Sequence, residues 1–254
     1  MSWKHFITSV LPILFFLTSS SALAQQKRIK IALSEDYYPW SYGQLNKVQG
    51  MSVDILKEIL EKQMNYQVQY VGLPWSRAQE DAFRGKYDAL CSIASEKRLK
   101  FMNASKHPVF RGMVRVYIRN TPSELAKVKG IQDLKSLTQA PLIFNIYVGA
   151  GWAADHLPAS KIEYSSSIES SIRKLVGGHG DVVVDNSLVV RYYLKKMNLE
   201  DKIKEIPIFI DNLDFYFLVN KNSKFNEDFE KFNKLFLAFS KTKAYRDILS
   251  KYPN

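Results

Sequence analysis

The alternation of strand and helix patterns near the start of the chain constrains the fold more than any other feature of the sequence. Residues 28–33 alternate as a strand does, and residues 52–60 place apolar side chains on one face of a helix. Strand, helix and strand patterns follow at 66–71, 76–84 and 87–91. This βαβαβ order is typical of a parallel sheet with helical crossovers, so the sequence predicts an α/β fold.

A second α/β unit follows the first. Residues 112–119 form a further strand pattern, and the polar connection at 120–130 separates the two units. The second unit begins with a strand at 141–146, continues with a helix carrying Ile168 and Ile172 on one face, and reaches a strand at 181–184. The sequence therefore predicts two domains.

The chain returns to the first unit near its end. Strand patterns at 206–210 and 214–219 precede two C-terminal helices. We therefore assign residues 25–115 together with 210–254 to lobe 1, and residues 116–209 to lobe 2.

Residue types that favour helix N-termini precede several of the predicted helices. A phenylalanine stripe in the penultimate helix, Phe229, Phe232 and Phe236, is expected to pack in the core rather than to bind a ligand. The expected capping residues are Ser52, Ser76 with Gln79, Ser166 with Glu169, and Asn226.

Two residues of opposite charge follow strands of the two units. Arg98 lies beyond the strand at 87–91, and Asp185 directly follows the strand at 181–184. Because ligands of open α/β sheets bind at the carboxyl ends of strands, this pair suits a zwitterion. Two alternatives stay open. Arg98 would instead be a surface residue beside other cations, and Asp185 a plain helix N-cap.

The first 24 residues are typical of a secretory signal peptide. A short basic start precedes an apolar stretch at 6–17, and Ala22-Leu23-Ala24 provides a small-residue cleavage signal. We expect cleavage after Ala24 and export of a soluble mature chain to the periplasm.

The distribution of charge does not favour a nucleic-acid partner, and the potential metal-ligating residues do not favour a metal or cofactor site. The formal net charge is +11, but lysines and acids are interspersed, so we expect a solvated surface. The lone cysteine, Cys91, lies in an apolar strand and is expected to be a buried, inert thiol. The four histidines show no metal-ligand spacing, so we expect no metal site and no cofactor.

Several motifs, in this order and spacing, resemble the amino-acid-binding branch of the type II periplasmic solute-binding proteins of ABC transporters. The likeness extends over residues 28–252. The motifs are Tyr37-Tyr38-Pro39-Trp40, Gly50-Met-Ser-Val-Asp54, Gly85-Lys-Tyr-Asp88, Ser95-Glu-Lys-Arg98 with Ala104-Ser105, Asp181-Val-Val-Val-Asp185, and Phe215–Val219.

The resemblance implies two α/β lobes with mixed, mostly parallel sheets, joined by hinge strands and closing on a ligand. It also implies that Arg98, aided by Ser95, binds the ligand's α-carboxylate, and that Asp185 binds the α-ammonium. Tyr38 and Trp40 would wall the ligand side chain.

The chemistry of the residues supports these ligand-binding roles and adds further candidates to the site. A guanidinium matches a carboxylate bidentately. Backbone N–H groups of the small-residue loop Gly149–Gly151 are placed to reach the same carboxylate, and Trp152 is a further candidate wall. Trp75 and Arg77 are interpreted as structural. The loop before Ser95 is about two residues shorter than is usual in the family and lacks its glycine, which leaves the ligand open.

The sequence therefore predicts an exported, monomeric solute-binding protein rather than an enzyme. It would capture a small polar ligand, an amino acid, by hinge closure and deliver it to an inner-membrane ABC permease. One alternative is an exported cyclohexadienyl-type dehydratase, for which Glu35, Asp36 or Glu96 would supply an acid or base. Another is a ligand sensor that signals to a membrane receptor.

Overall fold

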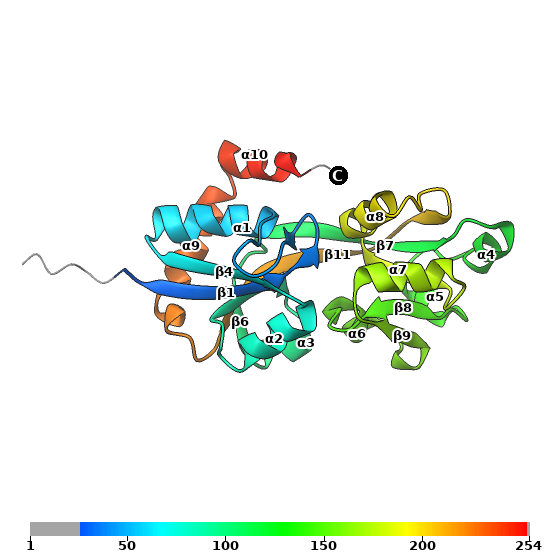
Figure 1. Ribbon diagram of the computed structural model, residues 1–254, viewed down its shortest axis with the longest axis horizontal. Helices are drawn as coiled ribbons and strands as arrows, with labels where there is room; N and C mark the ends of the chain where they lie inside the picture. Colours follow the sequence, from blue (N-terminus) through cyan, green and yellow to red (C-terminus); the bar gives the residue numbers. More distant parts are fainter. Residues whose placement is uncertain (1–25, 253–254) are drawn as a thin grey trace, which may run out of the picture.

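The computed structural model describes residues 26–252, which fold into two α/β lobes side by side (Figure 1). The predicted signal peptide lies outside the described residues. Two long strands, β7 (Phe110–Arg119) and β11 (Ile203–Asn220), run between the lobes and connect them. The domain boundaries expected at 115/116 and 209/210 fall within these strands. Among the described helices, none is long and apolar enough to cross a membrane.

Lobe 1 contains the N-terminal elements and the C-terminal helices. Its strands are β1 (Arg28–Ser34), β2 (Asp36–Tyr37), β3 (Ser41–Tyr42), β4 (Gln67–Leu73), β5 (Ala89–Ile93) and β6 (Met102–Ala104). Its helices are α1 (Met51–Leu56) with a π-helical continuation η1 (Lys57–Gln63), α2 (Trp75–Phe83), α3 (Glu96–Leu99), the 3₁₀ turn η3 (Lys224–Asp228), α9 (Phe229–Phe239) and α10 (Lys243–Lys251).

Lobe 2 is formed by the middle of the chain. Its strands are β8 (Phe144–Tyr147), β9 (Ile162–Ser165) and β10 (Val182–Asn186). Its helices are α4 (Pro122–Lys127), α5 (Leu134–Gln139), α6 (Gly151–His156), the 3₁₀ turn η2 (Ala159–Lys161), α7 (Ile168–Val176) and α8 (Ser187–Lys196).

One mixed sheet continues through both lobes in the order β4-β1-β5-β11-β7-β10-β8-β9, with β6 also paired to β11. Neighbouring strands are parallel at the two ends of this order and antiparallel around β7 and β11. The expected α/β fold is therefore confirmed. The two strands expected at 206–210 and 214–219 are a single strand, β11, whose pairing with β7 shifts in register between Ile206 and Asp211.

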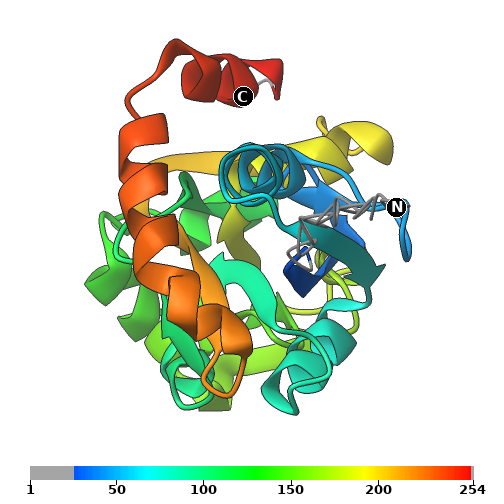
Figure 2. The same ribbon diagram turned by 90° about the vertical axis from the view of Figure 1, so that its left-hand side faces the viewer.

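Helices cover the sheet and bury the apolar faces that the sequence pattern predicts. In lobe 1, α10 lies over α1, and α9 packs on η1 (Figure 2). The phenylalanine stripe of α9 lies in the core as expected, with Phe232 and Phe236 almost fully buried. In lobe 2, Ile172 and Leu175 of α7 are buried among the strands.

The expected helix caps all differ from those in the structure. Helices α1 and α2 begin after Gly50 and Pro74, without a side-chain cap. Ser167, one residue later than expected, caps α7 through the backbone N–H of Ser170. Asn226 lies inside η3, and its amide donates to main-chain carbonyls instead of capping α9.

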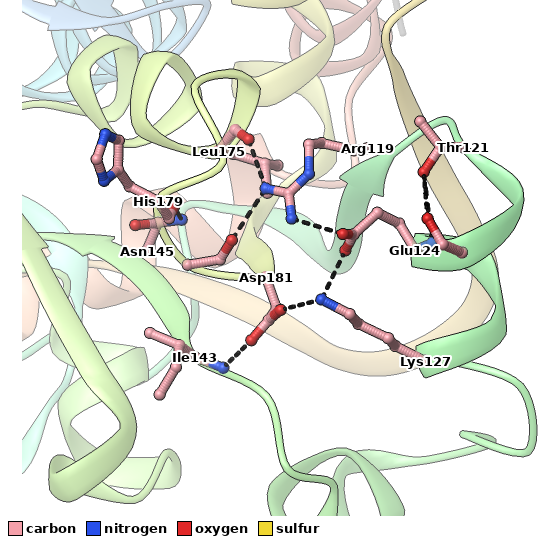
Figure 3. A network of polar contacts seen from close by, with 11 residues as sticks. Arg119, Thr121, Glu124, Lys127, Ile143, Asn145, Leu175, His179 and Asp181 are labelled. Carbon is pink, nitrogen blue, oxygen red and sulfur yellow. Dashed lines mark hydrogen bonds and ion pairs between the residues drawn. The ribbon is translucent and has the colours of Figure 1, made fainter.

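A network of ion pairs secures the far end of lobe 2 (Figure 3). Arg119, at the end of β7, donates to the carbonyls of Leu175 and Gly180 and pairs with Glu124 of α4 at 2.8 Å. Lys127 of α4 joins Glu124 to Asp181, which also accepts from the backbone N–H of residue 143. These contacts attach α4 to the strands β7 and β10.

Candidate ligand site between the lobes

A cavity lies between the two lobes and is lined by residues of both. Its walls combine hydroxyl-bearing side chains from lobe 1 with aromatic side chains from both lobes. Its charged lining residues are Arg98 from lobe 1 and Asp185 from lobe 2. The structure thus brings together the two residues of opposite charge that follow strand ends in the sequence. The aromatic lining residues are Tyr37, Trp40, Trp75, Tyr147, Trp152 and Phe215.

Arg98 lies in α3, directly after the loop that follows β5, and its side chain is buried. Nε donates to Oε1 of Gln79 at 2.9 Å, and Nη1 donates to the carbonyl of Ile93 at 3.0 Å. The guanidinium also lies 5.1 Å from the ring centre of Trp75, within the range of a cation–π contact. Burial lowers the pKa of Arg98 to about 10, so the side chain stays cationic at neutral pH.

The loop at Gly149 approaches Arg98 with a carbonyl rather than with N–H groups. Nη2 of Arg98 and Nε1 of Trp75 both donate to the Gly149 carbonyl, each at 2.9 Å. Gly149 has a φ of +92°, and a Cβ there would lie 2.4 Å from Nε2 of Gln79. Only glycine suits this backbone conformation and this close approach. Gly149 lines a neighbouring pocket, whereas Ala150 and Gly151 of the same loop line the cavity, and the expected contact of the loop N–H groups with a bound carboxylate stays a prediction.

Asp185 lies near the end of β10 and is 7% exposed. Its Oδ1 accepts from the hydroxyl of Tyr37 at 2.7 Å and from the backbone N–H of Asn186 at 2.6 Å. Burial raises the pKa of Asp185 to about 6, although both hydrogen bonds oppose this rise. The side chain of Asn186 caps α8 through the N–H of Leu188, so the alternative role of Asp185 as the plain N-cap is wrong.

The two tryptophans predicted to line the site do so. Trp40 is buried against Phe110, with ring centres 4.5 Å apart, and its Nε1 has no hydrogen-bond partner among the described residues. Trp152 donates from Nε1 to Asp211 at 2.7 Å. Both rings thus form part of the cavity wall.

Tyr38 and Ser95 lie outside the cavity lining. The ring of Tyr38 stacks on that of Tyr192 of α8, with centres 4.1 Å apart, and it faces a separate groove. Ser95 is buried at the start of α3 and lies beside Gly151. Ser95 lines a neighbouring pocket instead, and Tyr38 contributes to contacts between the lobes.

Among the lining residues that were not assigned to the site from the sequence are three aromatic ones near strand ends. Trp75 was interpreted as structural, and Tyr37 and Tyr147 were not singled out as ligand residues. A signal for all three is present in the chain, since each lies near the carboxyl end of a strand, as Arg98 and Asp185 do.

The acids considered for catalysis lie elsewhere. Glu35 and Asp36 line a neighbouring pocket that shares Tyr37, Trp75 and Tyr147 with the main cavity. Burial and the neighbouring Asp36 raise the pKa of Glu35. Glu96 is exposed. Within residues 26–252, no cluster of His, Cys, Asp and Glu is arranged to hold a metal ion.

Comparison with known proteins gives consistent matches over nearly the whole chain. The model of the family of bacterial extracellular solute-binding proteins, family 3, matches residues 29–254. The octopine-binding periplasmic protein of Rhizobium meliloti is 23% identical over 225 residues, covering 80% of this chain and 76% of that protein.

Solved structures share the two-lobed fold. A histidine kinase sensor domain with similarity to periplasmic binding proteins matches with a TM-score of 0.74 and 18% identity, covering 90% of this chain and 97% of that one. An ancestral arginine-binding protein bound to glutamine matches with a TM-score of 0.68 and 20% identity, covering 90% and 98%. With the family match over residues 29–254, these findings show that the chain belongs to family 3 of the bacterial extracellular solute-binding proteins.

Proposed function

We propose that this solute-binding protein captures an amino acid between its lobes and delivers it to an inner-membrane ABC permease. The observation that carries the proposal is the pair of buried, oppositely charged side chains, Arg98 and Asp185, which line one cavity from opposite lobes. A zwitterion complements both charges at once, whereas a simple anion or cation complements one of them.

The roles follow from the chemistry of the two groups. The guanidinium of Arg98 binds the ligand carboxylate, because its planar fork presents several N–H donors. Asp185 accepts from the ligand ammonium, and the neighbouring rings of Trp40 and Trp152 contact its side chain. Because the ligand touches both lobes, it stabilises the closed form over the open one, and closure is a shift in population.

The relatives support an amino-acid ligand without identifying it. One matched protein binds octopine and another is an arginine-binding protein solved with glutamine. The proposal that this chain also binds an amino acid depends on the charges of Arg98 and Asp185. The cleavage of residues 1–24, the periplasmic location and the monomeric state belong to the same proposal.

We also propose that the ligand leaves chemically unchanged. Among the described residues that line the main cavity, Asp185 is the only carboxylate, and Tyr37 hydrogen-bonds to it. Proton transfer to and from a substrate is usually carried out by positioned acid and base groups that face the reacting atoms. Glu35 and Asp36 line the neighbouring pocket instead.

A thermal-shift screen of residues 25–254 against the amino acids and small cyclic acids tests this function. A ligand at about 100 times its dissociation constant stabilises the folded state by about 2.7 kcal/mol. We expect one group of amino acids to raise the melting temperature of the wild type and to lose this effect in Arg98→Ala. NMR of the recovered ligand should show it unaltered. A response to cyclic acids alone, or their conversion to products, would instead favour the dehydratase alternative.

A further inference from the structure

We propose that Tyr37 is a latch that holds the two lobes closed before a ligand binds, so that ligand entry requires its release. The gating of entry rests on the proposed function, whereas the closure of the lobes is independent of it.

The first observation is the bond between the lobes at Asp185. The hydroxyl of Tyr37, on β2 of lobe 1, donates to Oδ1 of Asp185, on β10 of lobe 2, over 2.7 Å. The Tyr37 ring also contacts an aromatic ring of each lobe, with its centre 6.3 Å from that of Phe215 in lobe 1 and 6.2 Å from that of Tyr147 in lobe 2. Closure of the lobes thus forms an aromatic contact as well as the hydrogen bond, and both stabilise the closed form.

The two neighbours of Tyr37 also contact lobe 2. The carbonyl of Asp36 accepts from the hydroxyl of Tyr193 on α8, and the Tyr38 ring stacks on Tyr192 of the same helix. Three consecutive residues of lobe 1 thus bind lobe 2. A single chance contact would not produce this pattern, and the segment 36–38 is suited to open and close as a unit.

The second observation comes from the other side of the cavity. Arg98 and Trp75 of lobe 1 both donate to the carbonyl of Gly149 in lobe 2. A protein donor therefore faces Asp185, as a ligand ammonium would, and a protein acceptor faces Arg98, as a ligand carboxylate would. The lobes complement each other at both charged groups.

The hydrogen bonds between the lobes affect the rate at which a ligand enters the cavity. The cavity is lined from both lobes, so a ligand enters when the lobes separate and the contacts of Tyr37 break. The rate of association then scales with the fraction of molecules that are open. Removal of the Tyr37 hydroxyl should raise that fraction, and with it the association rate.

The test compares Tyr37→Phe with Tyr66→Phe in the full mature chain. Tyr66 is a matched control, because its hydroxyl donates to the carboxylate of Asp228 at 2.6 Å, but both residues lie within lobe 1. Small-angle X-ray scattering of the ligand-free proteins measures the separation of the lobes. We expect a compact wild type, an equally compact Tyr66→Phe variant and a more extended Tyr37→Phe variant.

Stopped-flow fluorescence with an amino acid that binds the wild type measures entry. We expect association with Tyr37→Phe to be about tenfold faster, the effect of losing one hydrogen bond to a charged group. Equal scattering curves for Tyr37→Phe and the wild type would overturn the latch, even if amino acids bind. If no amino acid binds, the proposed function fails, and the scattering comparison still decides the latch.

Discussion

Nη2 of Arg98 in lobe 1 donates to the main-chain carbonyl of Gly149 in lobe 2 over 2.9 Å. The other hydrogen-bond acceptors of this guanidinium are the side-chain amide of Gln79 and the carbonyl of Ile93, which are neutral groups. A buried cation is costly unless an opposite charge or several acceptors compensate it. The arrangement keeps a positive charge beside the cavity, where a ligand carboxylate would be a better partner than a carbonyl.

Gly151→Ala should keep the lobes apart. Gly151 begins α6 of lobe 2, and a Cβ there would lie 2.7 Å from Nη1 of Arg98 and 2.9 Å from Cβ of Ser95, both in lobe 1. We expect the variant to fold normally, to scatter X-rays as a more extended particle, and to bind ligands at least about tenfold more weakly because closure is strained. Gly177→Ala is the control, because the nearest atom to its added Cβ, the carbonyl oxygen of Arg173, would be an ordinary 3.4 Å away. A fully compact Gly151→Ala protein would contradict the observed approach of the lobes.

Asp185→Asn should stabilise the protein at neutral pH while weakening the binding of ammonium ligands. Burial raises the pKa of Asp185 to about 6, so the folded state disfavours the carboxylate relative to the unfolded chain. This penalty is absent below about pH 4, grows between about pH 4 and pH 6, and is complete above that range. It amounts to about 3 kcal/mol, since each pKa unit corresponds to about 1.4 kcal/mol.

Urea unfolding at about pH 4 and pH 7.5 measures this effect. The free energy of unfolding of Asp185→Asn should exceed that of the wild type at the higher pH and match it at the lower pH. Glu163→Gln, at an exposed acid of β9, should change neither value. A variant less stable than the wild type at pH 7.5 would show that the carboxylate stabilises the fold and is not held there for a ligand.

The network at the far end of lobe 2 should have the opposite pH dependence. Burial alone would raise the pKa of Asp181, but the hydrogen bonds from Lys127 and from the N–H of Ile143 outweigh it and lower the pKa. The carboxylate therefore contributes stability above about pH 4 that is lost as the pH falls through its lowered pKa.

Asp181→Asn should accordingly reduce the free energy of unfolding by about 1 kcal/mol at neutral pH, since Lys127 is partly exposed to solvent. The difference from the wild type should shrink near pH 3. Asp201→Asn, at an exposed acid of the same lobe, serves as the control. Equal losses at both pH values would indicate that the charge of Asp181 is not the stabilising feature.

Much of the fold could be predicted because its signals are long and periodic. The strands around 28–33 and 181–184 and the amphipathic face of α7 were recognised from their apolar spacing. Arg98 and Asp185 could be paired because both follow strands, and the carboxyl ends of strands in the two lobes meet at the cavity.

Short elements and side-chain orientation could not be predicted in the same way. Strand β2 is two residues long, too short for a periodic pattern to show that Tyr37 rather than Tyr38 lines the cavity. The expected Ser76–Gln79 capping box is wrong because α2 begins at Trp75, which places Ser76 inside the first turn, and Gln79 accepts from Arg98, a residue distant in sequence. Likewise, the role of Trp75 depends on a carbonyl of the other lobe.

Calorimetric titration of one bound amino acid and its two truncated analogues, lacking the amine or the carboxylate, tests the central claim most directly. The account predicts that removing the amine weakens binding to the wild type by about tenfold or more but has little effect on Asp185→Asn. Removing the carboxylate should likewise matter to the wild type and little to Arg98→Ala. Equal losses in the wild type and in both variants would contradict a ligand held between Arg98 and Asp185.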